Sequence, residues 1–423
     1  MKSHFRKLFL SIILCNHVLL TSCNQAQLEN GCDPSSESYR TFYLARILND
    51  DDREYCGSVA PNKSICEMDI LSVIQPRRWK YVQAELRKQA ALGTDGLVIG
   101  NLTTTVTGSA KWLGGVLTPK GKIVSMPFEQ SDILLIDPFT NETSFLSTGL
   151  SGSGKWEGGV LAPNGKVYGI PRNANKILVI DLEANKTYTI DSPLTGGNKW
   201  RGGILAPNGL IYGIPMAANQ ILVIDPKTDT VRTIASPLAE TNMWEGGILA
   251  PNGKIYAFPL VSNSILALDP FSERSYLIPT SEELIKWRHG VLAPNGKLFA
   301  MAADAPNFLV LDPNNDSVTY FPVPAVGGST TGRWRGGILA PDGKIYTIPA
   351  DNENIVTIDP DTLLTSVVNS GYASFNKWGD GVLAPNGKIY TIPHTEDDVL
   401  VINPGAKGNI CNSLIQSSYW NSY

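Results

Sequence analysis

The chain has 423 residues, of which 43% are hydrophobic and 17% charged, a composition typical of a folded protein with a substantial core. Its net charge of -4 provides no basic surface, which excludes nucleic acid as an expected partner. The 39 glycines and 28 prolines, without a low-complexity tract, indicate many tight turns between short strands.

Residues 1–22 have the features of a bacterial secretion signal. A positively charged start, MKSHFRK, precedes the apolar stretch LFLSIILCNHVLL, which is too short to span a bilayer comfortably. The following LTSC (20–23) resembles the lipobox of bacterial lipoproteins, which implies that Cys23 carries lipid and begins the mature protein. An ordinary secretion signal with an incidental cysteine is the alternative. Asn24 is compatible with the outer membrane, so we expect an envelope protein anchored there by its acyl chains and facing either the periplasm or the cell surface.

Residues 23–95 are predicted to form a spacer between the lipid and the rest of the chain, with a helix indicated by RRWKYVQAELRKQAAL (77–92). Four further cysteines have a spacing that matches no zinc site, and in an oxidising compartment their even number predicts disulfides. They are Cys32, Cys56, Cys66 and Cys411. Because only the last lies in the tail (406–423), at least one disulfide should join spacer and tail, with three connectivities open.

Tryptophan marks an internal repeat in the rest of the chain. Seven of the nine tryptophans recur at intervals of 43 to 47 residues: Trp112, Trp156, Trp200, Trp244, Trp287, Trp334 and Trp378. Each repeat contains four short strand patterns, which at this length is typical of a β-propeller blade. The sequence therefore predicts an all-β protein, a seven-bladed propeller of four-stranded antiparallel blades over residues 96–405.

One unit, residues 202–234, illustrates the pattern. GGILAP is followed by an Asn208-Gly209 hairpin turn, because these residues accept the positive φ angles of a tight turn. LIYGIP ends in a proline that cannot donate to a sheet, and ILVIDP is apolar at nearly every position, as expected of a strand covered on both faces. TVRTI alternates like an outer edge strand. The initial glycine pair lets the innermost strands approach one another near the axis.

The last copy lacks a fourth strand, whereas GLVIGNLTTTV (96–106) has the pattern of a strand and precedes the first copy. We expect this strand to complete the seventh sheet, so that both ends of the propeller close the ring without a covalent bond.

Units of the form GxxxxPNGxIYxIPxxxxxILVIDPxT resemble those of NHL, streptogramin-lyase and gluconolactonase-like propellers over about residues 96–405. The resemblance implies the fold and a ligand site at the channel mouth. In streptogramin-lyase relatives the catalytic His and Glu lie near the end of the second strand, where this chain has proline in six copies. Gluconolactonase-like relatives hold a metal with acidic and amide groups, and the inner strands here offer only Asp380 and His289. The catalytic machinery of these relatives therefore does not carry over. A weaker resemblance links NGCDPSSESYR (30–40) to the start of spirochaete-type surface lipoproteins.

The repeated tryptophans have two interpretations. Each indole packs between neighbouring blades with its N–H bonded to a carbonyl, or the seven form stacking platforms for sugars and cation–π sites, since Lys or Arg precedes six of them. The residues that directly follow the tryptophans form a ring of alternating charge. This ring is either a solvated rim or a site for an anionic or zwitterionic ligand near Arg288 and Arg335. The members of this ring are Leu113, Glu157, Arg201, Glu245, Arg288, Arg335 and Gly379.

Three departures from the repeat place ionisable side chains near the axis. His289 and Asp380 replace the first glycine of the pair in the fifth and seventh copies, and His394 follows the last second-strand proline. They are candidates for general acid–base catalysis or a weak metal site, and sequence drift in loops is the alternative. We expect a monomer without a cofactor that binds a protein or glycan as an adhesin or ligand-binding lipoprotein. The alternatives are a lyase or lactonase-type hydrolase acting in blades five to seven, with a divalent ion, and a structural platform of the envelope.

Overall fold

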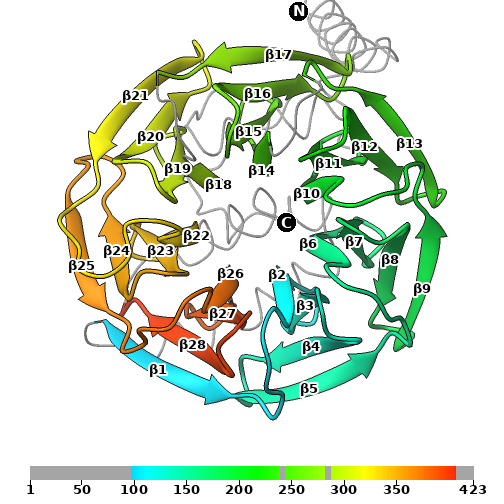
Figure 1. Cartoon of the computed structure of the whole chain (residues 1–423), viewed down its shortest axis with the longest axis horizontal. Coiled ribbons are helices and arrows are strands. Elements are labelled where there is room, and N and C mark those ends of the chain that lie inside the picture. The colour runs from blue at the N-terminus through cyan, green and yellow to red at the C-terminus, as the bar shows by residue number, and fades with distance from the viewer. Residues whose placement is uncertain (1–96, 239–242, 282–286, 406–423) are drawn as a thin grey trace, which may run out of the picture.

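The computed structural model describes residues 97–238, 243–281 and 287–405. Within these ranges, 28 strands form seven four-stranded antiparallel sheets that radiate from a central axis (Figure 1). The predicted seven-bladed propeller is therefore confirmed. No helix among these residues is long and apolar enough to cross a bilayer. The signal peptide, the spacer with its helix, the tail, and Cys23, Cys32, Cys56, Cys66 and Cys411 lie outside the described residues.

Each blade places its strands in sequence order from the axis outward, with one exception in the last blade. The inner strands are β2 (Trp112–Leu117), β6 (Trp156–Leu161), β10 (Trp200–Leu205), β14 (Trp244–Leu249), β18 (Trp287–Leu292), β22 (Trp334–Leu339) and β26 (Trp378–Leu383). The second strands are β3 (Ile123–Pro127), β7 (Val167–Pro171), β11 (Ile211–Pro215), β15 (Ile255–Pro259), β19 (Leu298–Ala302), β23 (Ile345–Pro349) and β27 (Ile389–Pro393). The third strands are β4 (Asp132–Asp137), β8 (Lys176–Asp181), β12 (Gln220–Asp225), β16 (Ser264–Asp269), β20 (Asn307–Asp312), β24 (Asn354–Ile358) and β28 (Asp398–Asn403). The outer strands are β5 (Glu142–Ser147), β9 (Lys186–Asp191), β13 (Thr230–Ala235), β17 (Arg274–Pro279), β21 (Ser317–Pro322), β25 (Thr365–Asn369) and β1 (Val98–Thr103).

The exception closes the ring. β1, the first strand of the propeller, pairs antiparallel with β28, the last one, from Val98 opposite Asn403 to Thr103 opposite Asp398. The seventh blade thus contains chain from both ends of the propeller (Figure 1), and the predicted non-covalent closure is confirmed.

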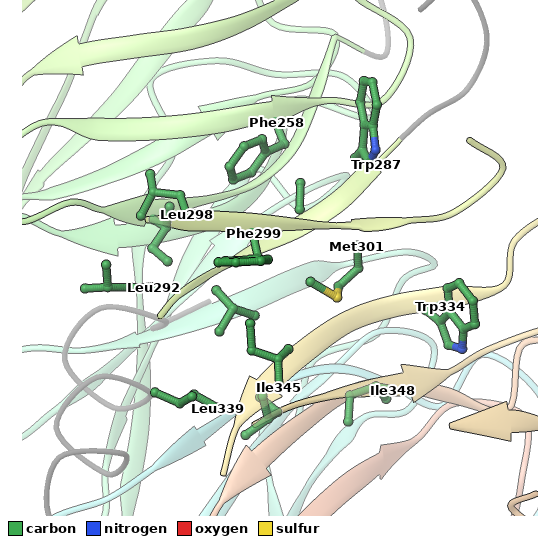
Figure 2. Close-up of a cluster of buried hydrophobic side chains, with 14 of the residues drawn as sticks. Phe258, Trp287, Leu292, Leu298, Phe299, Met301, Trp334, Leu339, Ile345 and Ile348 are labelled. Atoms are coloured by element: carbon green, nitrogen blue, oxygen red, sulfur yellow. The ribbon is translucent and has the colours of Figure 1, made fainter. Parts of the chain in front are cut away.

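The core lies between the blades, because each sheet is covered on both faces by its neighbours. The inner and second strands are buried at nearly every position, while the outer strands alternate between exposed and half-buried residues. Figure 2 shows one interface region, where Phe299 of β19 lies among side chains from the adjoining blades, including Phe258 and Ile345. Each large apolar side chain buried in this way contributes roughly 1.5–3 kcal/mol.

The two glycines of each pair have different roles. A Cβ atom on Gly114, whose φ is +92°, would lie 2.6 Å from the Cα atom of Gly158, so the first glycine allows two inner strands to meet backbone to backbone. A Cβ atom on Gly203 would lie 2.6 Å from Cδ1 of Ile170, so the second glycine accommodates a side chain of the preceding blade. The prediction that these glycines permit close approach is confirmed, and the second role adds to it.

The hairpin asparagine also joins blades, which the sequence did not reveal. Asn208 Nδ2 donates hydrogen bonds to the Tyr212 hydroxyl at 2.9 Å and to the carbonyl of Pro270 in the next blade at 2.7 Å. Equivalent bonds from asparagine to a proline carbonyl of the next blade, here called the Asn clamp, occur at five blade junctions. The other two copies have Lys120 and Asp342 at the turn position.

Candidate ligand site at the axial mouth

The repeated tryptophans are structural. All seven indoles are 0% or 1% exposed. In each blade the indole Nε1 donates to the backbone carbonyl of the residue twenty positions later, which begins the third strand of the same blade, at 2.7–2.9 Å. This geometry matches the packing interpretation, and side chains so deeply buried offer no open face on which a ligand could stack.

Lys199, one of the basic residues that precede the tryptophans, is also engaged within the fold. Lys199 Nζ donates to the carbonyls of Arg172, Ala174 and Gly196, and thereby ties the loop before its blade to the preceding blade. Burial lowers the pKa of Lys199 to about 8. Its Nζ also lies 5.9 Å from the centroid of the Trp200 ring, so the cation–π contact is internal to the protein.

The residues that follow the tryptophans form a buried arc of charge. Glu157, Arg201, Glu245, Arg288 and Arg335 lie at the starts of five successive inner strands, in blades two to six. Except for Arg288, which is half-buried, these residues are only 1–8% exposed, so the interpretation as a solvated rim is wrong.

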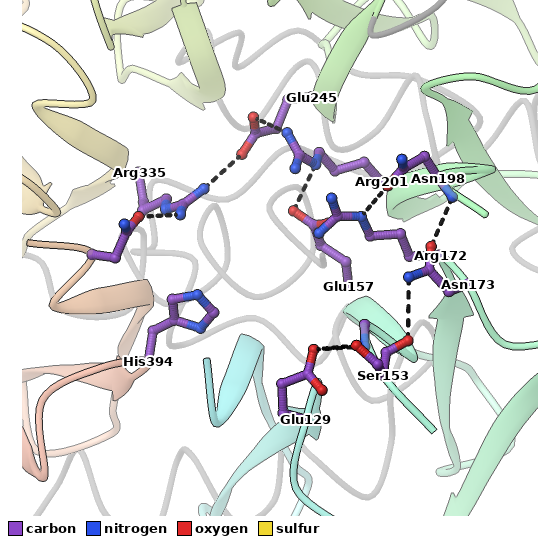
Figure 3. Close-up of polar contacts among 12 residues, drawn as sticks. Glu129, Ser153, Glu157, Arg172, Asn173, Asn198, Arg201, Glu245, Arg335 and His394 are labelled. Atoms are coloured by element: carbon purple, nitrogen blue, oxygen red, sulfur yellow. Dashed lines mark hydrogen bonds and ion pairs between the residues drawn. The ribbon is translucent and has the colours of Figure 1, made fainter. Parts of the chain in front are cut away.

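The arc is linked by ion pairs, most of which Figure 3 shows. Arg201 lies between two carboxylates, with Nε 2.7 Å from Glu157 Oε1 and Nη1 2.6 Å from Glu245 Oε2. Glu245 is shared by two further guanidinium groups, with Arg288 Nε at 3.4 Å and Arg335 Nη1 at 3.8 Å. We call Glu157, Arg201, Glu245, Arg288 and Arg335, together with Arg172, the axial cluster.

Arg172 and His394 extend the site from the second strands. Arg172 Nη1 lies 3.3 Å from Glu157 Oε2. The Arg172 guanidinium also lies 5.1 Å from the ring centroid of Phe128, and the imidazole of His394 contacts the same ring edge-to-face at 5.7 Å. These three residues occupy one repeat position, directly after the second strand, in blades two, one and seven. This position varies from copy to copy, whereas the residue before it is proline in six copies, and that contrast was the signal from which Arg172 and Phe128 could have been found.

Blades seven and one interrupt the arc. Their residues at the position of the charged side chains are Gly379 and Leu113, and a Cβ atom on Gly379 would lie 2.5 Å from Leu113 Cδ1. The charged arc is therefore a property of five blades and is not required by the repeat itself.

The pKa values of Glu245, Arg201 and Arg335 reflect competition between burial and neighbouring charge. Burial alone would raise the pKa of Glu245, but Arg201, Arg288 and Arg335 outweigh it and hold the pKa well below its usual range. Burial alone would lower the pKa of Arg201, but Glu157 and Glu245 outweigh it and raise the pKa. Burial, reinforced by repulsion from Arg288, lowers the pKa of Arg335 to about 10. Glu245, Arg201 and Arg335 are therefore charged at neutral pH.

His289, Asp380 and His394 each bind the backbone. Nδ1 of His289 lies 2.5 Å from the Arg335 carbonyl and Nδ1 of His394 lies 3.1 Å from the Trp112 carbonyl. Since a carbonyl only accepts, both rings carry their proton on Nδ1. Burial lowers the pKa of both histidines to about 4, and the positive charge of Arg335 adds to the effect on His394.

Asp380 joins blade seven to blade one at the axis. Its Oδ2 accepts from the backbone N–H of Gly115 at 2.8 Å and its Oδ1 accepts from that of Gly381 at 2.6 Å. His289 stands on β18, two blades away from Asp380 and His394. Among the residues that the structure describes, no three His, Cys, Asp or Glu side chains are grouped so as to hold a metal ion. The divalent-ion hypothesis therefore gains no support from the geometry.

Comparisons with solved structures agree on the fold. The structure is similar to a streptogramin B lyase, with a TM-score of 0.62 and 10% identity over 74% of this chain and 99% of the lyase. It is similar to virginiamycin B lyase from Staphylococcus aureus, with a TM-score of 0.62 and 13% identity over 73% of this chain and 99% of the lyase. It also resembles the extracellular domain of a hybrid two-component system from B. thetaiotaomicron, with a TM-score of 0.58 and 9% identity, covering 74% of this chain and 44% of that one. No protein-family model matches the sequence, and no curated protein matches it. The chain thus has the fold of streptogramin-lyase-type propellers, at identities that support the fold alone.

Proposed function

We propose that the chain is a lipid-anchored envelope protein whose propeller binds a ligand at the axial mouth. The observation that carries this proposal is the axial cluster, a set of buried charges in an arc of five blades. Burying charged groups costs free energy that ion pairing often fails to recover, and apolar replacements are commonly as stable. Blades seven and one use glycine and leucine at the same position, so closure of the ring does not depend on charge there. The arc is therefore best explained by binding.

The position of the axial cluster also suits a binding role. The inner strands of all blades converge at the axis (Figure 1), so one ligand there can contact several blades at once. Arg172 and Arg288 retain 19% and 16% exposure of their side chains, which makes them the members of the cluster that a ligand could contact first.

A thermal-shift screen tests this proposal. The probes are a panel of glycans, carboxylic acids, phosphorylated compounds and soluble matrix proteins. A probe that raises the melting temperature of the lipid-free protein should lose its effect in Arg288→Gln. It should keep its effect in Lys176→Gln, which removes an exposed surface pair with Asp191. If no probe shifts the melting temperature, or if every effective probe still acts on Arg288→Gln, the axial mouth is not the binding site.

The anchor is tested separately. Cells that express Cys23→Ala should fail to incorporate labelled palmitate into the protein, and the protein should leave the membrane fraction. Equal labelling of the variant would refute the anchor, and digestion by protease on intact cells would distinguish a surface location from a periplasmic one.

The lyase or hydrolase alternative has no comparable support. His289, Asp380 and His394 are engaged with backbone groups, and the lyases among the structural neighbours are too distant in sequence to suggest more than the fold.

A further inference from the structure

We propose that the group bound at the axial mouth is an anion with two negative charges, such as a sulfate or a phosphoryl group. This inference rests on the proposed function and specifies the chemistry of the ligand at the same site.

The first argument is the charge of the axial cluster. It contains four arginines and two glutamates, linked by the ion pairs described above, so 4 − 2 leaves an excess of two positive charges. His289 and His394 are neutral at pH 7 and add nothing. Asp380 accepts from backbone N–H groups, and even if its charge is counted, one positive charge remains in excess. Positive charge removed from water without a matching anion is costly, so a bound anion would stabilise this arrangement.

The second argument is the distribution of the ion pairs. Arg201 is paired on both sides, whereas Arg288 and Arg335 share the single carboxylate of Glu245 with it, at the longer distances of 3.4 and 3.8 Å. The buried Nε atom of Arg335 makes no hydrogen bond, although its Nη2 donates to Asn376 Oδ1 at 2.8 Å, and Nε of Arg288 has the long ion pair with Glu245 but no hydrogen bond. Guanidinium groups bind tetrahedral and planar oxyanions through paired N–H donors, so these two residues are suited to an oxyanion.

The third argument excludes a cation at this position. Glu157 and Glu245, which could attract one, are each contacted by at least two arginines. A cation near either glutamate would be repelled by the larger positive charge of the arginines, whereas an anion would be attracted by it.

The experiment measures sulfate binding by isothermal titration in a charge series, with sodium chloride at equal ionic strength as the reference. The series comprises Arg288→Gln with an excess of one charge, the unaltered protein with two, and Glu157→Gln with three. Affinity for sulfate should fall about ten-fold in Arg288→Gln and rise several-fold in Glu157→Gln, because one charge at contact distance has an effect of this order. A purely structural role would lower stability in both variants without changing affinity in opposite directions.

A second measurement on the unaltered protein protects the test against a variant that fails to fold. Affinity for inorganic phosphate should rise between pH 6 and pH 8 as the dianion forms, while affinity for sulfate stays constant. Both histidines remain neutral in this range, so they do not contribute.

The outcomes separate this inference from the function on which it rests. Equal sulfate affinity in all three proteins would identify an adventitious ion only and overturn the inference. If sulfate and phosphate fail to bind while a neutral probe from the screen binds in an Arg288-dependent manner, the inference fails and the proposed function stands. If no probe of any kind depends on Arg288, both fail.

Discussion

Acidification should destabilise this propeller through its two buried histidines. His289 and His394 have pKa values of about 4 in the fold because burial disfavours their charged form. In the unfolded chain each returns to a pKa near 6.5. As the pH falls from about 6.5 towards 4, the unfolded chain therefore binds protons that the folded protein does not, and stability is lost across this window.

The size of the effect follows from these two pKa values. Between pH 7 and pH 5 the unfolded state gains about 2 kcal/mol per histidine by protonation, because pH 5 lies about 1.5 units below its pKa. If the two histidines act independently, the free energy of unfolding should fall by about 4 kcal/mol from this cause. This is a large part of the stability of an ordinary domain.

Urea denaturation at pH 7 and pH 5 measures the effect, with His394→Gln as the comparison. Glutamine keeps an N–H donor for the Trp112 carbonyl but has no proton to gain, so the variant should lose about 2 kcal/mol less than the unaltered protein between the two pH values. Carboxylates such as Glu245 titrate alike in both proteins and cancel in the difference. Identical pH dependence of the two proteins would mean that His394 titrates equally in the folded and unfolded states, and the reasoning from burial would be wrong.

Three further substitutions test the internal contacts, each by urea denaturation. Trp200→Phe should lower the free energy of unfolding by about 2–4 kcal/mol, because it leaves the Gln220 carbonyl unpaired and a cavity beside it. The same variant should bind ligand unchanged, and a loss of binding without a loss of stability would revive the stacking interpretation. Asn208→Asp should cost about 1–3 kcal/mol, because a carboxylate cannot donate to the Pro270 carbonyl, and an unchanged stability would show that the Asn clamp carries little energy. Asp342→Asn should raise stability by about 1 kcal/mol by supplying a donor that this junction lacks, and no gain would indicate that its geometry differs from that of the five clamped junctions.

The fold could be predicted because the information for it is repeated seven times. Most copies carry the same turn and the same proline, and all carry a largely apolar third strand, so an ambiguous copy is interpreted through the others. The closing strand was predictable for a related reason, since a seventh blade with three strands and a spare strand of matching pattern leave one economical arrangement.

Only part of the candidate site could be predicted, because its chemistry depends on how deeply the charged side chains are buried. The charges that follow the tryptophans are visible in the sequence, and Arg288 and Arg335 were identified as ligand candidates. Whether these side chains meet water depends on how narrow the ring of inner strands is, and that is set by backbone contacts such as Gly114 against Gly158. No local pattern encodes this distance. The same limit applies to His289 and His394, whose shared departure from the repeat suggested one site although their blades are not adjacent.

Departures from the repeat fall into two groups, according to whether the residue at the contacting position of the neighbouring blade has changed as well. Where the Asn clamp is missing between blades one and two, Lys120 replaces the asparagine and Leu182 replaces the proline of the next blade, so both positions of this junction depart from the repeat together. The axial cluster is different. Its charges alternate in sign from Arg172 through Glu157, Arg201 and Glu245. The alternation then ends, because the next two blades both contribute an arginine, Arg288 and Arg335. A set of charges that only held blades together would be balanced, whereas among the residues that the structure describes the cluster has two more arginines than glutamates, which is the imbalance that the proposed anion would neutralise.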